Sequence, residues 1–435
     1  MRNLLFVAVS SLALAACGMN GAEEDATADT TAQAQPSEDY GYDTYDENNL
    51  ADSMASNDDA YGKGDSMANE DSAIPDSEER PIMQAQVVLD RVGFGPGVID
   101  GKMGMSTTNA LNGFQEANNL EVTGELDDAT RTALSDYDSI PATRVVTIPA
   151  SWSDTDYTQI PEDPAAKAEL KSMGYTSLDE RLAERFHTTI AVLKELNPDG
   201  RPAGMTAGMN DGAEANAEGR SDARATTTAT PTPTSSTKPG EKSGSGASTR
   251  TAAASQSYFR PGQKIRVPNI GADRIEKGRV DNGDWQRTLA SLGVGTDQPE
   301  VDRIVVSKAG KTLKAYQGEK LVALFTVSSG SSEFPLPLGD WKILGEAYNP
   351  PYNYDPSVLS GGKKSGKEYT LPPGPNSPVG IVWIDLSKEH YGIHGTPDPE
   401  TIGRAQSSGC VRLTNWDAAR LAGMVSQSTQ VIFEA

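Results

Sequence analysis

A long stretch near the start of this sequence almost lacks large apolar side chains. Residues 21–80 carry 18 Asp and Glu residues against two basic residues, with almost no Val, Ile, Leu or Phe. Such a segment cannot bury enough apolar surface to offset the conformational entropy that folding removes. We therefore expect the 435-residue chain to divide into several folded units joined by linkers.

Charge and composition exclude two broad classes of protein. The formal net charge is −23, and most of it comes from residues 21–80. Such a chain lacks the excess of Lys and Arg that neutralises phosphates, so nucleic acid is not an expected partner. Hydrophobic residues make up only 36% of the chain, which excludes a membrane protein with several spanning helices.

Residues 1–16 have the pattern of an export signal peptide. Arg2 gives a positive start, and residues 4–16 form a short run of apolar and small side chains. The run ends in Leu-Ala-Ala-Cys, which resembles the bacterial lipobox and implies that Cys17 becomes a lipidated mature N-terminus. An ordinary signal peptide with an incidental cysteine is the alternative. Lipid on Cys17 would anchor the protein in a membrane, and Gly18 at the next position favours the outer membrane, facing the periplasm. Residues 17–80 would then be an acidic, disordered tether.

Residues 81–137 show helical periodicity and are expected to form three short helices, the last of them capped by Asp127 or Asp128. The stretch 97–134 resembles the small peptidoglycan-binding domain of cell-wall hydrolases. The matching positions are Asp100, Gly101, Gly104, Thr108, Ala110, Leu111, Phe114, Gln115, Gly124, Asp127 and Thr130. The resemblance implies a docking module for the cell wall that is separate from the active site, and a spacer is the alternative.

Two later segments resemble the halves of a LysM-type glycan-binding module. Apolar residues recur at near-helical spacing in residues 165–200, and residues 258–270 supply the second half. Residues 201–257, rich in Ala, Thr, Ser and Pro, would be a disordered insertion, and residues 145–164 an extended link. His187 lies in the helical run and is expected to be structural or exposed. With three histidines in the chain, no metal site is expected.

From residue 301 to 435 the pattern changes to short apolar runs separated by Gly, Pro and Asn, which is typical of β-strands. The predicted strands lie within residues 303–307, 312–316, 320–330, 340–344, 380–386, 390–394 and 430–435. One helix is expected from Asn415, as its cap, to about residue 426. The sequence therefore predicts a mainly β C-terminal domain.

Cys410 lies sixteen residues after His394 in this predicted β domain. A thiol reacts as the thiolate and needs a nearby base, and imidazole is the base best matched to neutral pH. The carbonyl of Gly395 would hold the imidazole tautomer, and Gly409 would permit a turn that exposes the thiol and directs backbone N–H groups at an oxyanion. Arg412, two residues after the cysteine, would lie on the same side of a strand and bind a substrate carboxylate or brace the loop.

These residues belong to a longer motif that resembles the catalytic domain of L,D-transpeptidases, the YkuD domain. The matching positions are Ile393, His394, Gly395, Thr396, Gly403, Ser407, Gly409, Cys410, Val411, Arg412 and Leu413. The resemblance implies that Cys410 is the nucleophile, His394 the base, and the N–H groups of Gly409 and Cys410 the oxyanion hole. It also implies that Ser407 and Thr396 belong to the substrate site. Tyr391 would pack beside the base, His390 would be a flanking structural residue, and no cofactor or metal would be needed.

The sequence thus predicts a multidomain protein with long disordered segments. A small three-helix peptidoglycan-binding-like domain, an interrupted LysM-like α/β module and a mainly β, YkuD-like C-terminal domain would follow one another. The resemblance implies that a peptidoglycan tetrapeptide stem loses D-Ala and that its acyl group passes to an amine on another stem, on an envelope protein or on a free D-amino acid. An L,D-carboxypeptidase that passes the same acyl group to water, and a non-catalytic lipid-anchored wall tether, are the alternatives.

Overall fold

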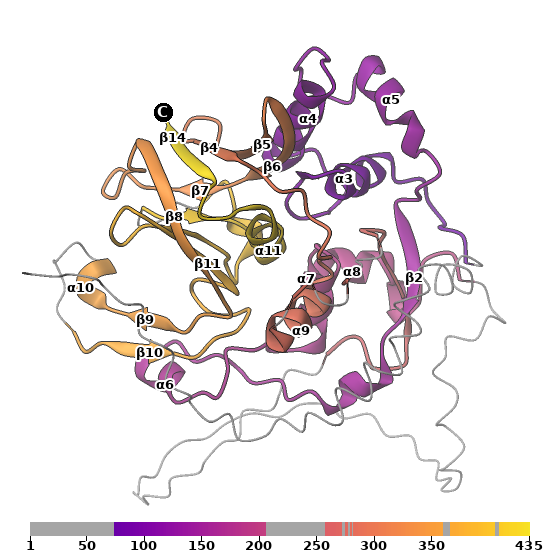
Figure 1. Cartoon of the computed structure of the whole chain (residues 1–435). Coiled ribbons are helices and arrows are strands. Elements are labelled where there is room, and N and C mark those ends of the chain that lie inside the picture. The colour runs from indigo at the N-terminus through magenta and orange to yellow at the C-terminus, as the bar shows by residue number, and fades with distance from the viewer. Residues whose placement is uncertain are drawn as a thin grey trace, which may run out of the picture. The chain divides into compact units, whose positions relative to one another are not determined.

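A computed structural model describes residues 74–205, 257–271, 275–276, 279–280, 282–359, 366–404 and 409–435 (Figure 1). The predicted signal peptide, Cys17, nearly all of the predicted tether and most of the predicted insertion lie outside these residues. Within the described part of the chain, no helix is both long enough and apolar enough to cross a membrane.

The C-terminal domain is built on a mixed sheet that has ten strands among the described residues. In sheet order these are β1 (Phe94–Gly95), β6 (Lys320–Thr326), β5 (Thr312–Gln317), β4 (Arg303–Ser307), β14 (Gln430–Glu434), β8 (Gly339–Tyr348), β11 (Val382–Leu386), β12 (Gly392–His394), β13 (Val411–Arg412) and β7 (Ser328–Ser329). Neighbouring strands are antiparallel except for the parallel pairs β1–β6, β4–β14 and β12–β13. In β4, Ile304 and Val306 are buried, while Arg303, Val305 and Ser307 are partly exposed, which is the alternation of a half-buried strand. The strands predicted from the sequence are therefore confirmed.

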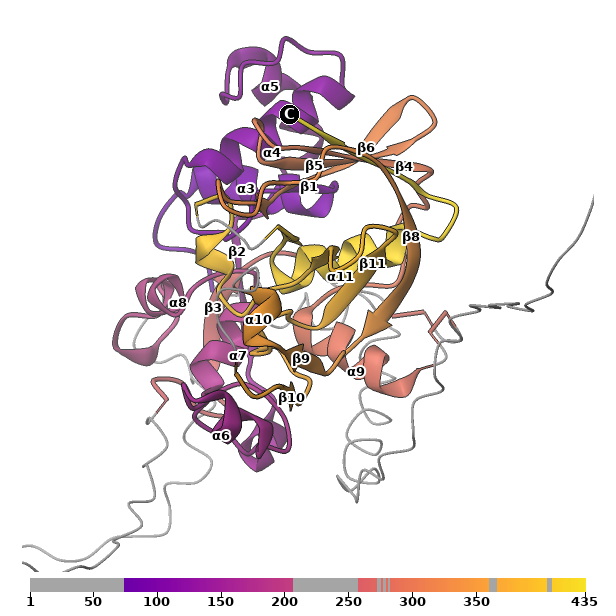
Figure 2. The same ribbon diagram turned by 90° about the vertical axis from the view of Figure 1, so that its left-hand side faces the viewer.

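Helix α11 (Asn415–Met424) packs against β11 and β12 of this sheet and against α9 (Gly283–Leu292) (Figure 2). Its apolar face is fully buried in the core of the domain, with Trp416 as the largest member. The prediction that Asn415 caps this helix is wrong. Thr414 is the cap, because its hydroxyl accepts a hydrogen bond of 3.1 Å from the backbone N–H of Asp417. The side chain of Asn415 is thereby available for another contact.

A two-stranded hairpin and some short helices complete this end of the chain. Strand β9 (Tyr352–Tyr354) pairs with β10 (Tyr369–Leu371) in an antiparallel sheet of its own. The short elements are α6 (Pro164–Ala168), which lies beside β10, α10 (Pro356–Leu359) and the 3₁₀ turn η5 (Pro399–Thr401).

The three helices predicted within residues 81–137 are present, and we call this region the helical domain. They are α3 (Pro81–Arg91), α4 (Met105–Ala117) and α5 (Asp128–Leu134), followed by the 3₁₀ turn η1 (Ser135–Tyr137). Asp127 caps α5 as predicted, accepting 2.8 Å from the N–H of Thr130. The buried Gln115 accepts from the N–H groups of Thr123 and Gly124, each at 2.9 Å, and so holds the loop between α4 and α5.

The segments predicted to form one interrupted module share a single core, and we call them the middle module. Helices α7 (Leu178–Arg185) and α8 (Ile190–Leu196) pack against β3 (Lys264–Pro268), which pairs with β2 (Thr143–Thr147). The 3₁₀ turns η2 (Ala150–Asp154) and η3 (Pro198–Gly200) flank these elements. The predicted extended link therefore begins within a strand, β2, which the sequence analysis did not identify.

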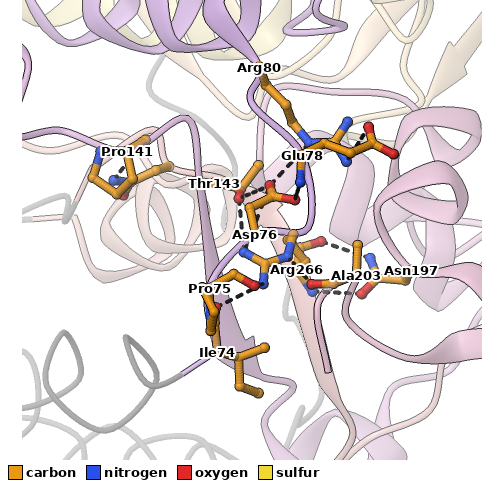
Figure 3. Close-up of polar contacts among 11 residues, drawn as sticks. Ile74, Pro75, Asp76, Glu78, Arg80, Pro141, Thr143, Asn197, Ala203 and Arg266 are labelled. Atoms are coloured by element: carbon orange, nitrogen blue, oxygen red, sulfur yellow. Dashed lines mark hydrogen bonds and ion pairs between the residues drawn. The ribbon is translucent and has the colours of Figure 1, made fainter. Parts of the chain in front are cut away.

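A buried arginine fixes the ends of two predicted disordered segments to the middle module (Figure 3). The guanidinium of Arg266, 2% exposed, donates to the carbonyls of Ile74 at 2.9 Å, Pro75 at 3.0 Å and Ala203 at 2.9 Å. It also donates to the hydroxyl of Thr143 at 3.0 Å. Ile74 is the first described residue, and Ala203 is the third residue of the predicted insertion. Both segments therefore meet the folded protein at one side chain.

All described residues lie in one compact unit of the chain, Asp52–Ala435, and the helical domain is joined to the sheet within it. Strand β1 of the helical domain pairs with β6, and Val88, Phe94 and Leu111 share a core with Leu324. This differs from the separate docking module expected from the sequence. The physical reason is that β1 has only two residues, which is too short to show the alternation of apolar and polar residues by which a strand is predicted from sequence.

Candidate active site

Two parallel neighbouring strands bring the predicted nucleophile and base together. His394 ends β12, and Cys410 directly precedes β13. Ile393 is in register with Val411, and His394 with Arg412, so the backbone of Cys410 lies opposite Gly392. A backbone hydrogen bond from Gly392 also reaches Cys410. The sheet therefore brings the two residues onto adjacent parallel strands, with His394 two residues further along the ladder than Cys410.

The ring of His394 is held in one orientation. It is 6% exposed, and Nδ1 lies 2.7 Å from the carbonyl oxygen of Gly395. Because a carbonyl can only accept, Nδ1 donates and Nε2 of the neutral ring keeps its lone pair. This is the contact expected from the sequence. Trp383 of β11 stacks on the ring, with centroids 5.4 Å apart and planes 17° from parallel.

Burial keeps both partners of the pair neutral. It lowers the pKa of His394 to about 4, with a further contribution from the cationic Arg412, although the Gly395 hydrogen bond opposes the shift. Burial raises the pKa of Cys410, although Gly392 and Arg412 act in the opposite direction. At neutral pH Cys410 is therefore a thiol and His394 a neutral imidazole.

Gly409 shapes the chain just before the thiol. Its φ of +111° lies in a region that L side chains rarely adopt. A Cβ at this position would lie 2.6 Å from Cε1 of Tyr391, so the ring occupies the space that a side chain would need. Any larger residue at 409 would have to displace Tyr391 or change the turn that presents Cys410.

Arg412 supplies positive charge next to the thiol. It is half-buried, and burial lowers its pKa, while Asp398 and Cys410 act in the opposite direction. The guanidinium therefore interacts electrostatically with both the carboxylate of Asp398 and the thiol of Cys410. This position suits either role expected for it, binding a carboxylate or bracing the loop.

The other residues predicted for the site are placed as follows. Tyr391 packs on Gly409, and the aromatic ring that stacks on His394 is Trp383. Thr396 is buried, and its hydroxyl accepts from the N–H of Asp398 at 3.3 Å. Ser407 lies outside the described residues.

The chain's remaining histidines differ in their surroundings. The His390 side chain is 64% exposed beside Glu389, whereas its backbone carbonyl lies 3.7 Å from Sγ of Cys410. His187 is fully buried and stacks on Trp416, so it is structural and not exposed. Among the described residues, no group of three or more His, Cys, Asp or Glu side chains is arranged to hold a metal ion.

Sequence reasoning missed two aromatic residues of the site. Trp383 stacks on the base, and Tyr352 of β9 lies close enough to Cys410 to respond to its charge. Burial, together with Cys410, raises the pKa of Tyr352 to about 12. Trp383 alternates with the buried Val382 and Ile384, so strand periodicity could have placed it on the opposite face. No local pattern marks Tyr352.

Comparison with known proteins supports two domains. Residues 301–433 match the sequence profile of the L,D-transpeptidase catalytic domain, YkuD, and residues 79–134 match that of a putative peptidoglycan binding domain. The chain is 34% identical over 129 residues to the putative L,D-transpeptidase YkuD of Bacillus licheniformis. It is 33% identical over 128 residues to the protein of the same name in Bacillus subtilis. These matches cover 30% and 29% of this chain, and the chain spans 63% of the length of each relative.

Solved structures with similar regions carry related names. An L,D-transpeptidase from Mycobacterium smegmatis matches with 23% identity and a TM-score of 0.26, covering 33% of this chain and 61% of that one. The catalytic domain of the Enterococcus faecium L,D-transpeptidase matches with 21% identity and a TM-score of 0.24, covering 31% and 97%. On the sequence matches, the C-terminal domain is a YkuD-type L,D-transpeptidase catalytic domain, and the helical domain is of the peptidoglycan-binding type.

Proposed function

We propose that the protein is a cysteine-dependent L,D-transpeptidase that acts on peptidoglycan stems in cell-wall biogenesis. The donor would be a tetrapeptide stem, attacked at the carbonyl of its L-centred third residue, usually meso-diaminopimelate. D-Ala would leave, and an amine would receive the acyl group. The observation that carries the proposal is the imidazole of His394, fixed by the Gly395 carbonyl on the strand adjacent to Cys410.

The reaction begins from the neutral pair. His394 Nε2 takes the proton from the thiol of Cys410 as Sγ forms a bond with the substrate carbonyl carbon. The N–H groups of Gly409 and Cys410 stabilise the oxyanion that results. The C–N bond to D-Ala then breaks, and the proton on His394 passes to the departing amine. A thioester on Cys410 remains.

The second half of the reaction returns the enzyme to its first state. An acceptor amine attacks the thioester carbon and gives a proton to His394, and the C–S bond breaks. The proton then returns to Cys410. The acceptor would be a second stem, giving a 3→3 cross-link, or an amine on an envelope protein. Water in the same position would make the enzyme an L,D-carboxypeptidase.

The other parts of the chain suit delivery of this activity to the cell wall. The helical domain would bind peptidoglycan. The middle module would be a glycan-binding unit of LysM type, and the core that its two segments share supports their being one unit. Lipid on Cys17 would hold the protein at the outer membrane, with the acidic segment spanning to the wall. A chain of some sixty flexible residues has an r.m.s. span of roughly 40 Å, and repulsion among its carboxylates extends it.

Incubation of the protein with a disaccharide tetrapeptide, followed by mass analysis, tests the reaction. Cross-linked dimers together with released D-Ala would support transpeptidation, whereas tripeptide alone would support hydrolysis. Cys410→Ala should abolish both products and any acyl-enzyme mass while the circular dichroism spectrum stays unchanged. Products that persist in this variant would overturn the assignment of the nucleophile. A wild-type protein without products or an acyl-enzyme would favour the non-catalytic tether.

A further inference from the structure

The middle module reaches the catalytic domain through a buried carboxyl group behind the active site. Glu184, on α7, is 8% exposed, and its Oε1 accepts a hydrogen bond of 2.6 Å from Nδ2 of Asn415. The same Nδ2 donates to the carbonyl of Pro375 at 3.2 Å. Because a carbonyl oxygen only accepts, this second contact fixes which end of the Asn415 amide faces Glu184.

The other end of that amide fits into a notch lined by two glycines next to the catalytic base. A Cβ added to Gly395 would lie 2.2 Å from Oδ1 of Asn415, and one added to Gly380 would lie 2.0 Å from it. Asn415 therefore packs directly on the backbone of Gly395. The carbonyl of that same residue holds Nδ1 of His394 at 2.7 Å.

A neighbouring carboxylate on α7 supports the same wall of the site. Glu180 accepts from Nδ2 of Asn376 at 2.7 Å, and Asn376 lies in the loop that contains Pro375. Two acidic residues of one helix in the middle module therefore hold the loop and the asparagine that stand behind His394. Neither carboxyl group has a role in the proposed reaction.

From these contacts we infer that Glu184 is a positioning residue for the proposed transpeptidase, acting through Asn415 and the Gly395 carbonyl to orient the imidazole of His394. The inference rests on the proposed function of the Cys410–His394 pair and adds the middle module to the machinery of that pair. It assigns to α7 a role beyond binding glycan: the catalytic base is oriented only when the module is folded against it.

Glu184 is largely protonated at neutral pH, which makes glutamine the conservative substitution for the test. Burial raises its pKa to about 8, with the charge of Glu180 adding to the shift and the Asn415 hydrogen bond opposing it. The buried Tyr175 also faces this group. Since Glu184 is largely neutral at pH 7, glutamine should reproduce both its shape and its accepting oxygen.

The test compares Glu184→Ala with Glu184→Gln in the full chain. Loss of the side chain should lower kcat for acylation about 10- to 100-fold with little change in KM, because the base is displaced and no substrate contact is removed. Glu184→Gln should stay within about threefold of the wild type. Asn415→Ala, which removes the next member of the series from the other domain, should reproduce the effect of Glu184→Ala.

A second readout needs no peptidoglycan. The His394 ring signals are assigned in a ¹H–¹³C NMR titration by their absence in His394→Gln, with His187 and His390 as internal references. Glu184→Ala should move the imidazole pKa of His394 upward from about 4, because a loosened ring gains access to water. Glu184→Gln should leave it in place.

The matched control is Asp179→Ala, which removes another buried carboxylate of α7. Asp179 accepts from the backbone N–H groups of Tyr258 at 2.8 Å and Phe259 at 3.0 Å, within the middle module. This variant should lower the stability of the module but leave the His394 pKa unchanged. The inference is overturned if Asp179→Ala shifts that pKa as much as Glu184→Ala, if Glu184→Ala leaves it unchanged, or if Glu184→Gln is as damaging as alanine. A wild-type protein that forms no acyl-enzyme would overturn the proposed function, while the titration would still decide whether Glu184 orients His394.

Discussion

At the active site and at the junction of helices α3 and α11, ionisable side chains are buried to a similar degree, yet only the junction keeps its charges. His394 is 6% exposed, and Asp90 and Arg420 at the junction are 2% and 7% exposed. Arg420 donates two hydrogen bonds to Asp90, at 2.8 and 2.9 Å, and Nδ1 of His187 lies 3.4 Å from the same carboxylate. Burial alone would raise the pKa of Asp90, but Arg420, with help from His187, holds it well below its usual range.

The difference shows what decides the charge of a buried group. At the junction each charge has an opposite charge with bidentate geometry, which offsets the loss of hydration. At the active site His394 faces a carbonyl and an aromatic ring, and no carboxylate contact is found for it among the described residues. It therefore stays neutral and can accept a proton. The junction provides fixed structure, whereas the active site provides a proton acceptor.

Removal of the proton acceptor should have the largest effect. We expect His394→Gln to lower the rate of Cys410 acylation about 10²–10⁴-fold, since the thiol then has no base. The measurement is acyl-enzyme formation followed by mass spectrometry. His390→Gln is the matched control, because the ring of His390 is exposed and the contact of this residue with the Cys410 thiol is through its backbone carbonyl. A loss of this size in His390→Gln, with little loss in His394→Gln, would show that His390 and not His394 is the base.

Removal of one charge at the junction should cost stability instead. We expect Asp90→Ala to lower the free energy of unfolding by about 3–5 kcal/mol, because the buried Arg420 loses its bidentate carboxylate partner. Chemical denaturation measures this loss. Glu276→Ala, which removes an ion pair whose side chains are 35% and 55% exposed, should cost under about 1 kcal/mol. The double variant Asp90→Leu with Arg420→Met should recover much of the stability that Asp90→Ala loses. If it does not, the pair stabilises the fold by more than compensating the burial of its own two charges.

The contrast between these sites also explains what the sequence could predict. The strands from residue 301 onward, the three helices and the Asp127 cap follow from local periodicity and capping chemistry, and the structure has them. The nearness of Cys410 to His394 was expected from a motif that lies in one stretch of chain. The orienting carbonyl of Gly395 is likewise a neighbour in sequence.

Contacts between distant segments were not predictable in this way. Asp90 and Arg420 lie 330 positions apart, and Glu184 and Asn415 lie 231 apart. Asn415 was assigned as a helix cap because asparagine suits that position locally. Thr414, one residue earlier, meets the same need, and only the packing of α7 shows what the asparagine contacts.

Acid should reveal the neutral state of His394. Its pKa falls from 6.5 to about 4 on folding, so the unfolded chain binds a proton that the native state excludes. This contribution to stability is complete above pH 6.5 and is lost as the pH falls to about 4, by about 3 kcal/mol in total. The measurement is the difference in unfolding free energy between the wild type and His394→Gln across this pH range. A difference that does not change with pH would mean that folding leaves the pKa of His394 unchanged.

Asp417 sharpens the comparison, because it lies in the charged junction but behaves like a group of the neutral site. Burial raises its pKa from 3.8 to about 6. Arg420, which is engaged by Asp90, acts in the opposite direction, and the charge of Asp90 adds to the effect of burial. Its Oδ1 is buried without a hydrogen-bond donor among the described residues.

The folded pKa of Asp417 is above the unfolded one, so its contribution to stability is full below pH 3.8 and is lost as the pH rises through about 6. This slope is opposite to that of His394 over nearly the same range, and the two largely cancel in the wild type. Asp417→Asn should therefore raise the unfolding free energy above pH 7 by about 3 kcal/mol and expose the acid-side loss due to His394. If the variant were less stable above pH 7 than the wild type, the fold would stabilise the ionised Asp417, and its folded pKa would not be raised above 3.8.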